Sequence, residues 1–372
     1  MIAAWRAKVK NLTQIETRLL ALPRDLMTPQ LQSYLIIVLA FIATWAISEL
    51  IRRNARNLNL VQLPNERSSH TSPTPSGGGL GIAVASTICG FIVGPELVVP
   101  VLVSASAALL GLIDDRFGLS ARLRLLIHFV IIGSLLLALT ALPVLSTPFG
   151  EIPPWAMGLV LLVGGVWWIN LYNFMDGIDG LAASQAIYMG LSAITLTRLN
   201  GSSTPDAMSI WLLAVSSASA GFLVLNWAPA RIFMGDAGSN FLATAIFAVF
   251  VGMIADGHLS LPTFMILAAL FFTDATITLL GRIRNGSHGF SAHRLHVYQK
   301  LSRRPGGHRM ATLIYLAINV AWLYPLAYFA QTFDDTSWWL TCLAYCPIVL
   351  FCLLARAGLP DSQPIPRKPS YE

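Results

Sequence analysis

The chain has 372 residues, of which 55% are hydrophobic and only 11% carry a charge, with a mean hydropathy of +0.65. Soluble domains carry about 25% charged residues, so this composition excludes an ordinary soluble protein and predicts an all-α, polytopic membrane protein. The net charge of +6 would suggest nucleic-acid binding in a soluble chain. Here we attribute it to basic loops on the cytoplasmic face, and we expect no nucleic-acid partner.

About eleven stretches are long and apolar enough to cross a membrane, because a spanning helix needs roughly 20 apolar residues. We expect them to form one transmembrane catalytic domain over residues 31–356. An N-terminal extension over 1–30 precedes it, and a cytoplasmic tail over 357–372 follows. The predicted spans are 31–51, 79–95, 97–113, 125–142, 156–172, 181–198, 209–228, 240–257, 261–281, 311–330 and 337–356.

Lys and Arg residues set the predicted orientation. The loops of the opposite face carry only Arg198, and by the positive-inside rule the basic loops are cytoplasmic. Residues 1–30 disagree, because five basic residues there precede an odd number of spans. Two explanations stay open: an amphipathic surface segment, or translation that begins at Met27. The basic loops are 52–78, 114–124, 229–239 and 282–310.

The first cytoplasmic loop contains Arg67 and His70, two side chains that could contact an anionic ligand. The same loop ends in a run of three glycines, residues 77–79, directly before the second span. Such a run serves as a hinge or as a surface for close backbone contact. From the sequence alone, a linker is the favoured interpretation of this loop.

Asp114 and Asp115 end the third predicted span as an adjacent pair of carboxylates. Carboxylates at a bilayer are costly and usually mark function. Phosphoryl transfer aided by Mg²⁺ requires such groups to bind the metal and to accept a proton. The alternative is an interfacial charge cluster paired with Arg116.

Asn173, Asp176 and Asp179 follow the fifth predicted span with i, i+3, i+6 spacing. If this segment is helical, the three side chains form one polar stripe. The alternative is helix capping by a turn rich in Asn and Asp. Capping needs one such residue rather than three on one stripe, so we favour a ligand-binding role.

Asp236 lies between Gly235 and Gly238 in the loop that joins the seventh and eighth spans. The glycines suit a tight loop that brings backbone N–H groups toward phosphate. Alternatively, Asp236 is the N-cap of the eighth helix. Asp274 lies inside the ninth span and needs a partner or a polar cavity there; one interpretation places it facing the site from below.

His293, Arg294 and His296 lie in the most basic loop. Histidines at i, i+3 spacing suggest Zn²⁺, but no further Cys or His pair nearby completes a tetrahedral set. Carboxylate-rich surroundings favour Mg²⁺ or Mn²⁺. We interpret the histidines and the arginine as donors to phosphate oxygens. The alternative is a basic loop attracted to anionic headgroups.

Together these strings resemble the polyprenyl-phosphate N-acetylhexosamine-1-phosphate transferases, the MraY/WecA superfamily of glycosyltransferase family 4. The similarity covers nearly the whole chain, most clearly residues 60–310, and the motifs agree in order, spacing and sidedness. The matching strings are Asp114-Asp115, Asn173-x-x-Asp176-x-x-Asp179-Gly-Leu-Ala and Met234-Gly-Asp236-x-Gly-Ser.

The resemblance implies transfer of a sugar-1-phosphate from a UDP-sugar to a polyprenyl phosphate, with release of UMP. In bacteria the lipid is undecaprenyl phosphate, and the enzyme spans the inner membrane with its site facing the cytoplasm. It implies Mg²⁺ (or Mn²⁺) held by Asp236 and Asp115. In one scheme Asp114 deprotonates the lipid phosphate, which attacks directly, and a two-step route through an enzyme nucleophile stays open. We expect Asp114, Asp115 and His293 to be catalytic, and Asn173, Asp176, Asp179, Arg294, His296, Arg67 and His70 to bind substrate.

The histidine string His293-Arg-x-His296-x-Tyr298-Gln299 is sparser than in the peptidoglycan branch of this family. It resembles the branch that initiates O-antigen and other surface glycans, with UDP-GlcNAc, UDP-GalNAc, UDP-QuiNAc or UDP-FucNAc as donor. Synthesis of the peptidoglycan precursor lipid I is an alternative. A secondary transporter is a rival from another class, although transporters place charges near the midplane rather than at span ends. The resemblance also leaves a homodimer open.

Overall fold

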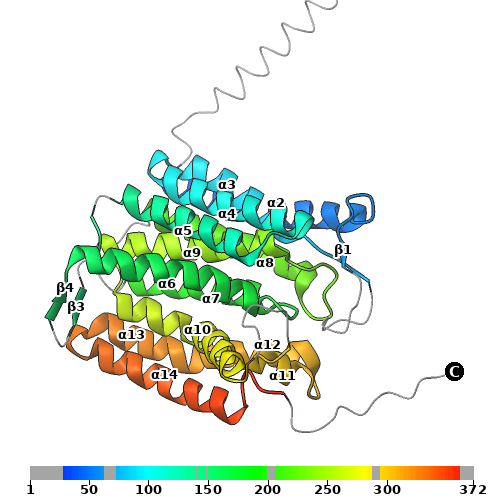
Figure 1. Ribbon diagram of the computed structural model, residues 1–372. Helices are drawn as coiled ribbons and strands as arrows, with labels where there is room; N and C mark the ends of the chain where they lie inside the picture. The colour runs from blue at the N-terminus through cyan, green and yellow to red at the C-terminus, as the bar shows by residue number, and fades with distance from the viewer. Residues whose placement is uncertain are drawn as a thin grey trace, which may run out of the picture.

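The computed structural model describes residues 28–62, 73–139, 141–143, 145–147, 150–198, 206–286 and 294–360. Within these residues the chain forms a bundle of helices that run between two common ends (Figure 1). Nine of the described helices are long and apolar enough to cross a membrane, and two shorter apolar helices accompany them. The predicted polytopic, all-α membrane protein is therefore confirmed, and each predicted span overlaps one of these helices.

The elements follow one another in a simple order along the described part of the chain. They are α2 (Pro29–Asn54), β1 (Val61–Gln62), β2 (Thr74–Pro75), α3 (Gly79–Val93), η2 (Pro95–Leu97), α4 (Val98–Phe117), α5 (Ala121–Ala138), β3 (Leu145–Thr147), β4 (Gly150–Ile152), α6 (Pro154–Met175), α7 (Leu181–Thr197), α8 (Ala207–Asn226), α9 (Asp236–Ala255), α10 (Leu261–Arg284), α11 (Val297–Ser302), α12 (Gly307–Ile318), η4 (Asn319–Leu323), α13 (Tyr324–Thr332), η5 (Asp334–Thr336) and α14 (Ser337–Leu354).

Short polar residues start several of these helices. The side chains of Thr28, Ser120, Asp206 and Ser260 each accept a hydrogen bond from the backbone N–H three residues later. These caps pair a donor that the first turn of a helix leaves unsatisfied. Two antiparallel hairpins, β1–β2 and β3–β4, lie in loops at opposite ends of the bundle (Figure 1).

Helix α9 is the centre of the bundle and packs against α3, α4, α6 and α8. Nearly all of its residues are buried. Its sequence is apolar or small on every side, which is typical of a helix surrounded by other helices. The first residue of α9 is Asp236. The most buried helix therefore delivers a carboxylate to one end of the bundle.

Buried polar groups inside the bundle pair with one another or with backbone. The Trp168 indole donates to the Ala243 carbonyl at 3.0 Å, and the Tyr172 hydroxyl donates to the Ala182 carbonyl at 2.6 Å. Pairing of this kind is required where lipid offers no hydrogen bonds. These contacts fix α6 against α9 and against the start of α7.

The tenth predicted span is a helix with a widened turn. Helices α12 and α13 are joined by the π-helical turn η4, which ends two residues before Pro325. Proline has no N–H and cannot continue the regular hydrogen-bond ladder, so the backbone bonds rearrange around it. Single π-turns of this kind are frequent at functional sites.

Candidate active site

The predicted acidic motifs lie at a common end of the bundle. The carboxyl ends of α4 and α6 and the amino ends of α7 and α9 meet there, close to α11 and α12 (Figure 1). The hairpin β3–β4 marks the other end. Convergence of the acidic motifs on one face was the central prediction from the sequence, and this arrangement agrees with it.

Asp114 lies in the last turn of α4 and is 8% exposed. One of its carboxylate oxygens accepts the Leu119 N–H at 2.7 Å, and the other accepts Arg124 Nη1 at 2.5 Å. Its cationic partner is therefore Arg124 from the first turn of α5, not the neighbouring Arg116 that the sequence suggested. Both oxygens of Asp114 are held by protein donors.

Asp115 contacts the first residue of the central helix. Its Oδ2 accepts the backbone N–H of Asp236 at 3.1 Å. Arg124 Nη1 also lies 3.9 Å from Asp236 Oδ2, so one guanidinium stands between two carboxylates of different helices. Asp236 itself is the first residue of α9, and Gly235 is its N-cap with φ of 78°. The alternative in which Asp236 serves as the N-cap is therefore wrong.

The glycine run at residues 77–79 forms a close-contact surface and not a free linker. Gly78 N–H and Gly79 N–H donate to the carbonyls of Phe233 and Met234, each at 2.9 Å. A Cβ on Gly79 would collide with the Cα of Gly238. The absence of side chains therefore lets α3 press directly on the loop that carries Asp236.

Asn173 orients Asp236 from the last turn of α6. Its Nδ2 donates to Asp236 Oδ1 at 3.0 Å and to the Ser239 hydroxyl at 3.0 Å. Helix α6 ends at Met175, and residues 176–180 form a turn. The helical stripe expected for Asn173, Asp176 and Asp179 is therefore wrong, because the backbone leaves the helix within the motif.

Asp176 is the C-cap residue of α6, and its side chain lies near other carboxylates. Burial raises the pKa of its carboxyl well above the ordinary value, and the negative charges of Asp236, Asp115 and Asp179 raise it further. A bound cation would offset the negative charge that gathers here.

Asp179 has a different set of partners. Its Oδ2 accepts the Ala230 N–H at 3.0 Å, and its Oδ1 lies 3.0 Å from Nδ1 of His308 at the start of α12. Its backbone carbonyl accepts the Thr312 hydroxyl at 2.9 Å. Asp179 thereby ties the turn before α7 to the 227–235 loop and to α12.

Asp274 anchors the histidine segment. This fully buried carboxylate in α10 accepts the backbone N–H groups of Val297 and Tyr298 at 2.9 and 3.1 Å and the Tyr315 hydroxyl at 2.6 Å. His296 Nδ1 lies 3.6 Å from the same carboxylate. Asp274 therefore holds the start of α11 in place, which explains its presence inside a span.

The described part of the histidine motif is packed against α6. The His296 ring is buried and stacked on Tyr298, whose hydroxyl donates to the Phe174 carbonyl at 2.8 Å. Arg294 is partly buried, and its carbonyl accepts Arg303 Nη1 at 3.0 Å. Desolvation lowers the pKa of the Arg294 guanidinium, and the charge of Arg303 lowers it further. The predicted site residues Arg67, His70 and His293 lie outside the described residues.

The donor set at the head of α9 suits a hard divalent cation. Asp115 and Asp236 offer carboxylate oxygens from adjoining backbones, and Asp176 adds charge to their surroundings. Within the residues that the structure describes, no three acidic, His or Cys side chains already form a metal cage. Mg²⁺ needs no such cage, because it is commonly held by one or two carboxylates, waters and substrate phosphates. The residues present fit that mode of binding.

Three residues of this centre were not singled out from the sequence. Arg124 was counted only as a loop charge, Ser239 only closed the Met234-Gly-Asp236-x-Gly-Ser string without a role of its own, and His308 carried no distinguishing pattern. Each becomes visible only through its contact with Asp114, Asp179 or Asn173. The contacts could not be read from the sequence, because the paired residues lie far apart in the chain or show no regular spacing.

Comparisons with known proteins place the chain in a family. The model of the family described as Glycosyl transferase family 4 matches residues 97–254, which include Asp114, Asp115, Asn173 and Asp236. A Bacillus subtilis (strain 168) protein described as a probable undecaprenyl-phosphate N-acetylglucosaminyl 1-phosphate transferase is 30% identical. That alignment runs over 297 residues and covers 76% of this chain and 82% of that protein.

Two further relatives carry related descriptions. The decaprenyl-phosphate N-acetylglucosaminephosphotransferase of Mycolicibacterium smegmatis is 30% identical over 76% of this chain and 78% of its own length. The undecaprenyl-phosphate alpha-N-acetylglucosaminyl 1-phosphate transferase of Yersinia pestis is 28% identical over 72% of this chain and 76% of its own length. The chain thus belongs to the polyprenyl-phosphate N-acetylhexosamine-1-phosphate transferase superfamily, glycosyl transferase family 4.

Proposed function

We propose that this protein transfers an N-acetylhexosamine-1-phosphate from a UDP-sugar to undecaprenyl phosphate and releases UMP. The observation that carries the proposal is the contact between Asp115 and Asp236, with Arg124 beside both Asp114 and Asp236. Carboxylates that carry a divalent cation, together with a guanidinium, can hold two anionic phosphate groups next to each other. A lipid phosphate reaches such a site from the membrane surface.

Asp236 and Asp115 are the residues that would hold Mg²⁺ (or Mn²⁺) in this proposal. When bound, the cation offsets the charge of the diphosphate, so that a second phosphate can approach it. Asn173 fixes one oxygen of Asp236 and leaves the other turned toward Arg124. The guanidinium of Arg124 contributes a positive charge whether or not a metal ion is bound.

The proposed reaction is an exchange at the β-phosphorus of the donor. An oxygen of the acceptor phosphate forms a bond to that phosphorus, while the bond from the same phosphorus to the bridging oxygen breaks. UMP leaves with the electron pair. Asp114 is the acceptor-side base in one scheme, and for this its carboxylate would first part from Arg124. Because both of its oxygens are engaged, we assign Asp114 mainly the task of orienting Arg124.

The donor and the orientation are also proposals. UDP-GlcNAc is the first donor to test, since the similar proteins above are described as N-acetylglucosamine 1-phosphate transferases. The basic loops at the carboxylate end favour a site facing the cytoplasm from the inner membrane. Initiation of O-antigen or another surface glycan is the pathway that we propose for the product.

The test is an assay for UMP with purified protein, undecaprenyl phosphate, MgCl₂ and a panel of UDP-N-acetylhexosamines. We expect release of UMP that stops when EDTA is added and returns with Mg²⁺. Asp236→Asn and Asp115→Asn should each lower kcat by about a hundredfold to a thousandfold. Asp256→Asn, an exposed carboxylate at the other end of α9, is the matched control and should stay active.

Two outcomes would contradict this proposal in different ways. Failure to release UMP from any donor, with metal and lipid present, would remove the transferase assignment for this chain. Normal turnover by both Asp236→Asn and Asp115→Asn would leave the reaction in place but move the metal site elsewhere.

A further inference from the structure

His308, in the first turn of α12, contacts the turn that carries two of the predicted site carboxylates. We call residues 176–180 the acidic turn. Nδ1 of His308 lies 3.0 Å from Asp179 Oδ1, and the His308 side chain is 17% exposed. The backbone N–H of Asp179 approaches the same nitrogen at 3.4 Å. One nitrogen cannot donate to the carboxylate and accept from the N–H at once, so we assign the proton to Nδ1 and the bond to the shorter contact.

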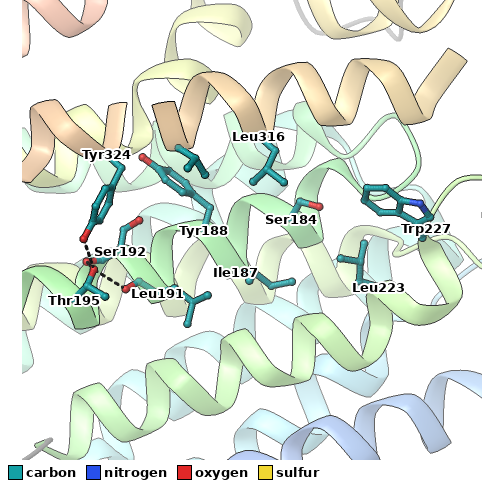
Figure 2. A pocket seen from close by; sticks show the side chains of 11 residues that line it. Ser184, Ile187, Tyr188, Leu191, Ser192, Thr195, Leu223, Trp227, Leu316 and Tyr324 are labelled. Carbon is teal, nitrogen blue, oxygen red and sulfur yellow. Dashed lines mark hydrogen bonds between the residues drawn. The ribbon is translucent and has the colours of Figure 1, made fainter. Parts of the chain in front are cut away.

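A second contact from the same helix reinforces the first. The Thr312 hydroxyl donates to the Asp179 carbonyl at 2.9 Å. Residues four apart share one face of a helix, so His308 and Thr312 both hold Asp179 from α12. Leu316 continues this face, and Figure 2 shows it opposite Ser184 of α7. Helix α12 therefore lies against α7 along a line that starts at the acidic turn.

The other side of the acidic turn is bound by the loop that precedes α9. Asp179 Oδ2 accepts the Ala230 N–H at 3.0 Å. The side chain of Asn226 accepts the Gly180 N–H at 2.9 Å and donates to the Ile232 carbonyl at 2.9 Å. The acidic turn is therefore fixed between this loop on one side and α12 on the other.

The two carboxylates of the acidic turn have different surroundings. Both oxygens of Asp179 contact groups of the protein, one from the loop before α9 and the other from His308, and its side chain is 11% exposed. Asp176 lies three residues earlier in the same turn, close to Asp236 and Asp115. The contacts of Asp179 therefore decide where Asp176 stands relative to the start of α9.

We infer that His308 is a positioning residue, which holds Asp179 through Nδ1 and so keeps Asp176 beside the start of α9. The inference rests on the proposed function. In this role His308 touches neither substrate. A displacement of about 1 Å at a reacting centre can cost a hundredfold in rate, so loss of the contact should lower kcat. Neither KM should change, because the contact is made with the protein and not with a substrate.

The kinetic test compares three substitutions of His308 that differ in where they place a polar group. Asparagine carries its amide nitrogen near the position of Nδ1, glutamine carries it near the position of Nε2, and leucine has no polar atom. We expect His308→Asn to keep most of the UMP release. His308→Gln and His308→Leu should lower kcat by about tenfold to a hundredfold, with both KM values unchanged. Arg309→Gln is the control and should behave as wild type, because Arg309 is exposed at the next position of α12.

The second test measures backbone hydrogen exchange over residues 176–184 and needs no activity. The Gly180 N–H is bonded to Asn226 while the acidic turn stays in place. We therefore expect faster exchange in His308→Gln and His308→Leu than in wild type and His308→Asn. Arg309→Gln should exchange as wild type does.

Four results would overturn the inference. Activity kept by His308→Gln but lost by His308→Asn, or a raised KM for either substrate, would indicate that the imidazole contacts a substrate directly. Equal losses in all three variants, or wild-type turnover and exchange in all three, would show that the Nδ1 contact does not position the turn. Turnover is compared among variants that elute as wild type does, and His308→Gln serves alone if His308→Leu does not fold. If wild-type protein releases no UMP, the proposed function fails, while hydrogen exchange still decides whether His308 holds the acidic turn.

Discussion

The Oδ2 of Asp115 accepts the backbone N–H of Asp236 at 3.1 Å, although the two residues are 121 positions apart in the chain. This bond joins the end of α4 to the beginning of the central helix α9. A carboxylate at a helix amino terminus is stabilised by the unpaired N–H groups there. The bond also places the carboxylate of Asp115 near the carboxylate of Asp236, so that negative charge is concentrated at the start of α9.

Arg124 is the cation that the chain itself supplies to this centre. We expect Arg124→Gln to lower turnover by about a hundredfold, because the substitution removes the positive charge beside Asp114 and Asp236. Steady-state release of UMP measures the effect. Arg122→Gln is the control, since Arg122 is exposed two residues earlier in the same helix. Equal losses in the two variants would indicate general attraction of anions rather than a specific site.

Asp176 should destabilise the metal-free protein at neutral pH. The pKa of its carboxyl is raised in the folded state, first by burial and then by its acidic neighbours. The folded protein therefore binds this proton more tightly than the unfolded chain does. Its contribution to stability is most favourable below the ordinary value of 3.8, and it falls as the pH rises from there through the raised pKa.

It follows that Asp176→Asn should melt at a higher temperature than wild type at pH 7 in EDTA, and that the difference should shrink at acid pH. Added Mg²⁺ should stabilise wild type more than the variant. Thermal melts in detergent at several pH values measure both effects, with Asp256→Asn as the control. A variant less stable than wild type at neutral pH without metal would refute this electrostatic account.

Gly79 controls how closely α3 approaches the Asp236 loop. In Gly79→Ala the new methyl group would meet the Gly238 backbone and the Met234 carbonyl, and relief of that overlap costs about 1–3 kcal/mol. We expect lower thermal stability and lower kcat, because Asp236 shifts with the loop. In Gly164→Ala the methyl group meets nothing within 4 Å, so this variant should behave as wild type. Full activity in Gly79→Ala would show that the centre tolerates displacement of this loop.

Asp274 should matter for stability more than for chemistry. Asp274→Ala leaves the N–H groups of Val297 and Tyr298 and the hydroxyl of Tyr315 without their acceptor, at a cost of about 3 kcal/mol. We expect a lower melting temperature and easier proteolysis of the segment around α11. Asp274→Asn, which keeps one acceptor oxygen, should recover part of the loss. A variant with lost activity but unchanged stability would give Asp274 a direct role in the reaction.

Much of the fold is readable from hydropathy and charge alone. Apolar stretches of the right length predict the spans because lipid forces each backbone to satisfy its own hydrogen bonds. The ends of the spans were less certain. The eighth was expected to begin at residue 240, but α9 begins at Asp236, since Gly235 and not an Asp or Asn is its N-cap.

The motifs were readable, but their local geometry was not. Spacing suggested one helical stripe from Asn173 to Asp179, yet α6 ends at Met175 and the side chains have different partners. Asn173 contacts Asp236, whereas Asp179 contacts Ala230 and His308. The i, i+3, i+6 spacing places the three side chains on one face only if α6 continues through Asp179. The helix ends before that point, and each side chain takes its partners from other parts of the chain.

By itself the sequence determined that this chain spans a membrane many times and carries acidic motifs at the ends of its spans, because hydropathy and charge act locally along the chain. Only the tertiary structure decided which charges meet. The pairing of Asp114 with Arg124 and the contact between Asp115 and Asp236 both depend on which helices pack together. That packing is set by glycine contacts and buried hydrogen bonds between segments far apart in the chain.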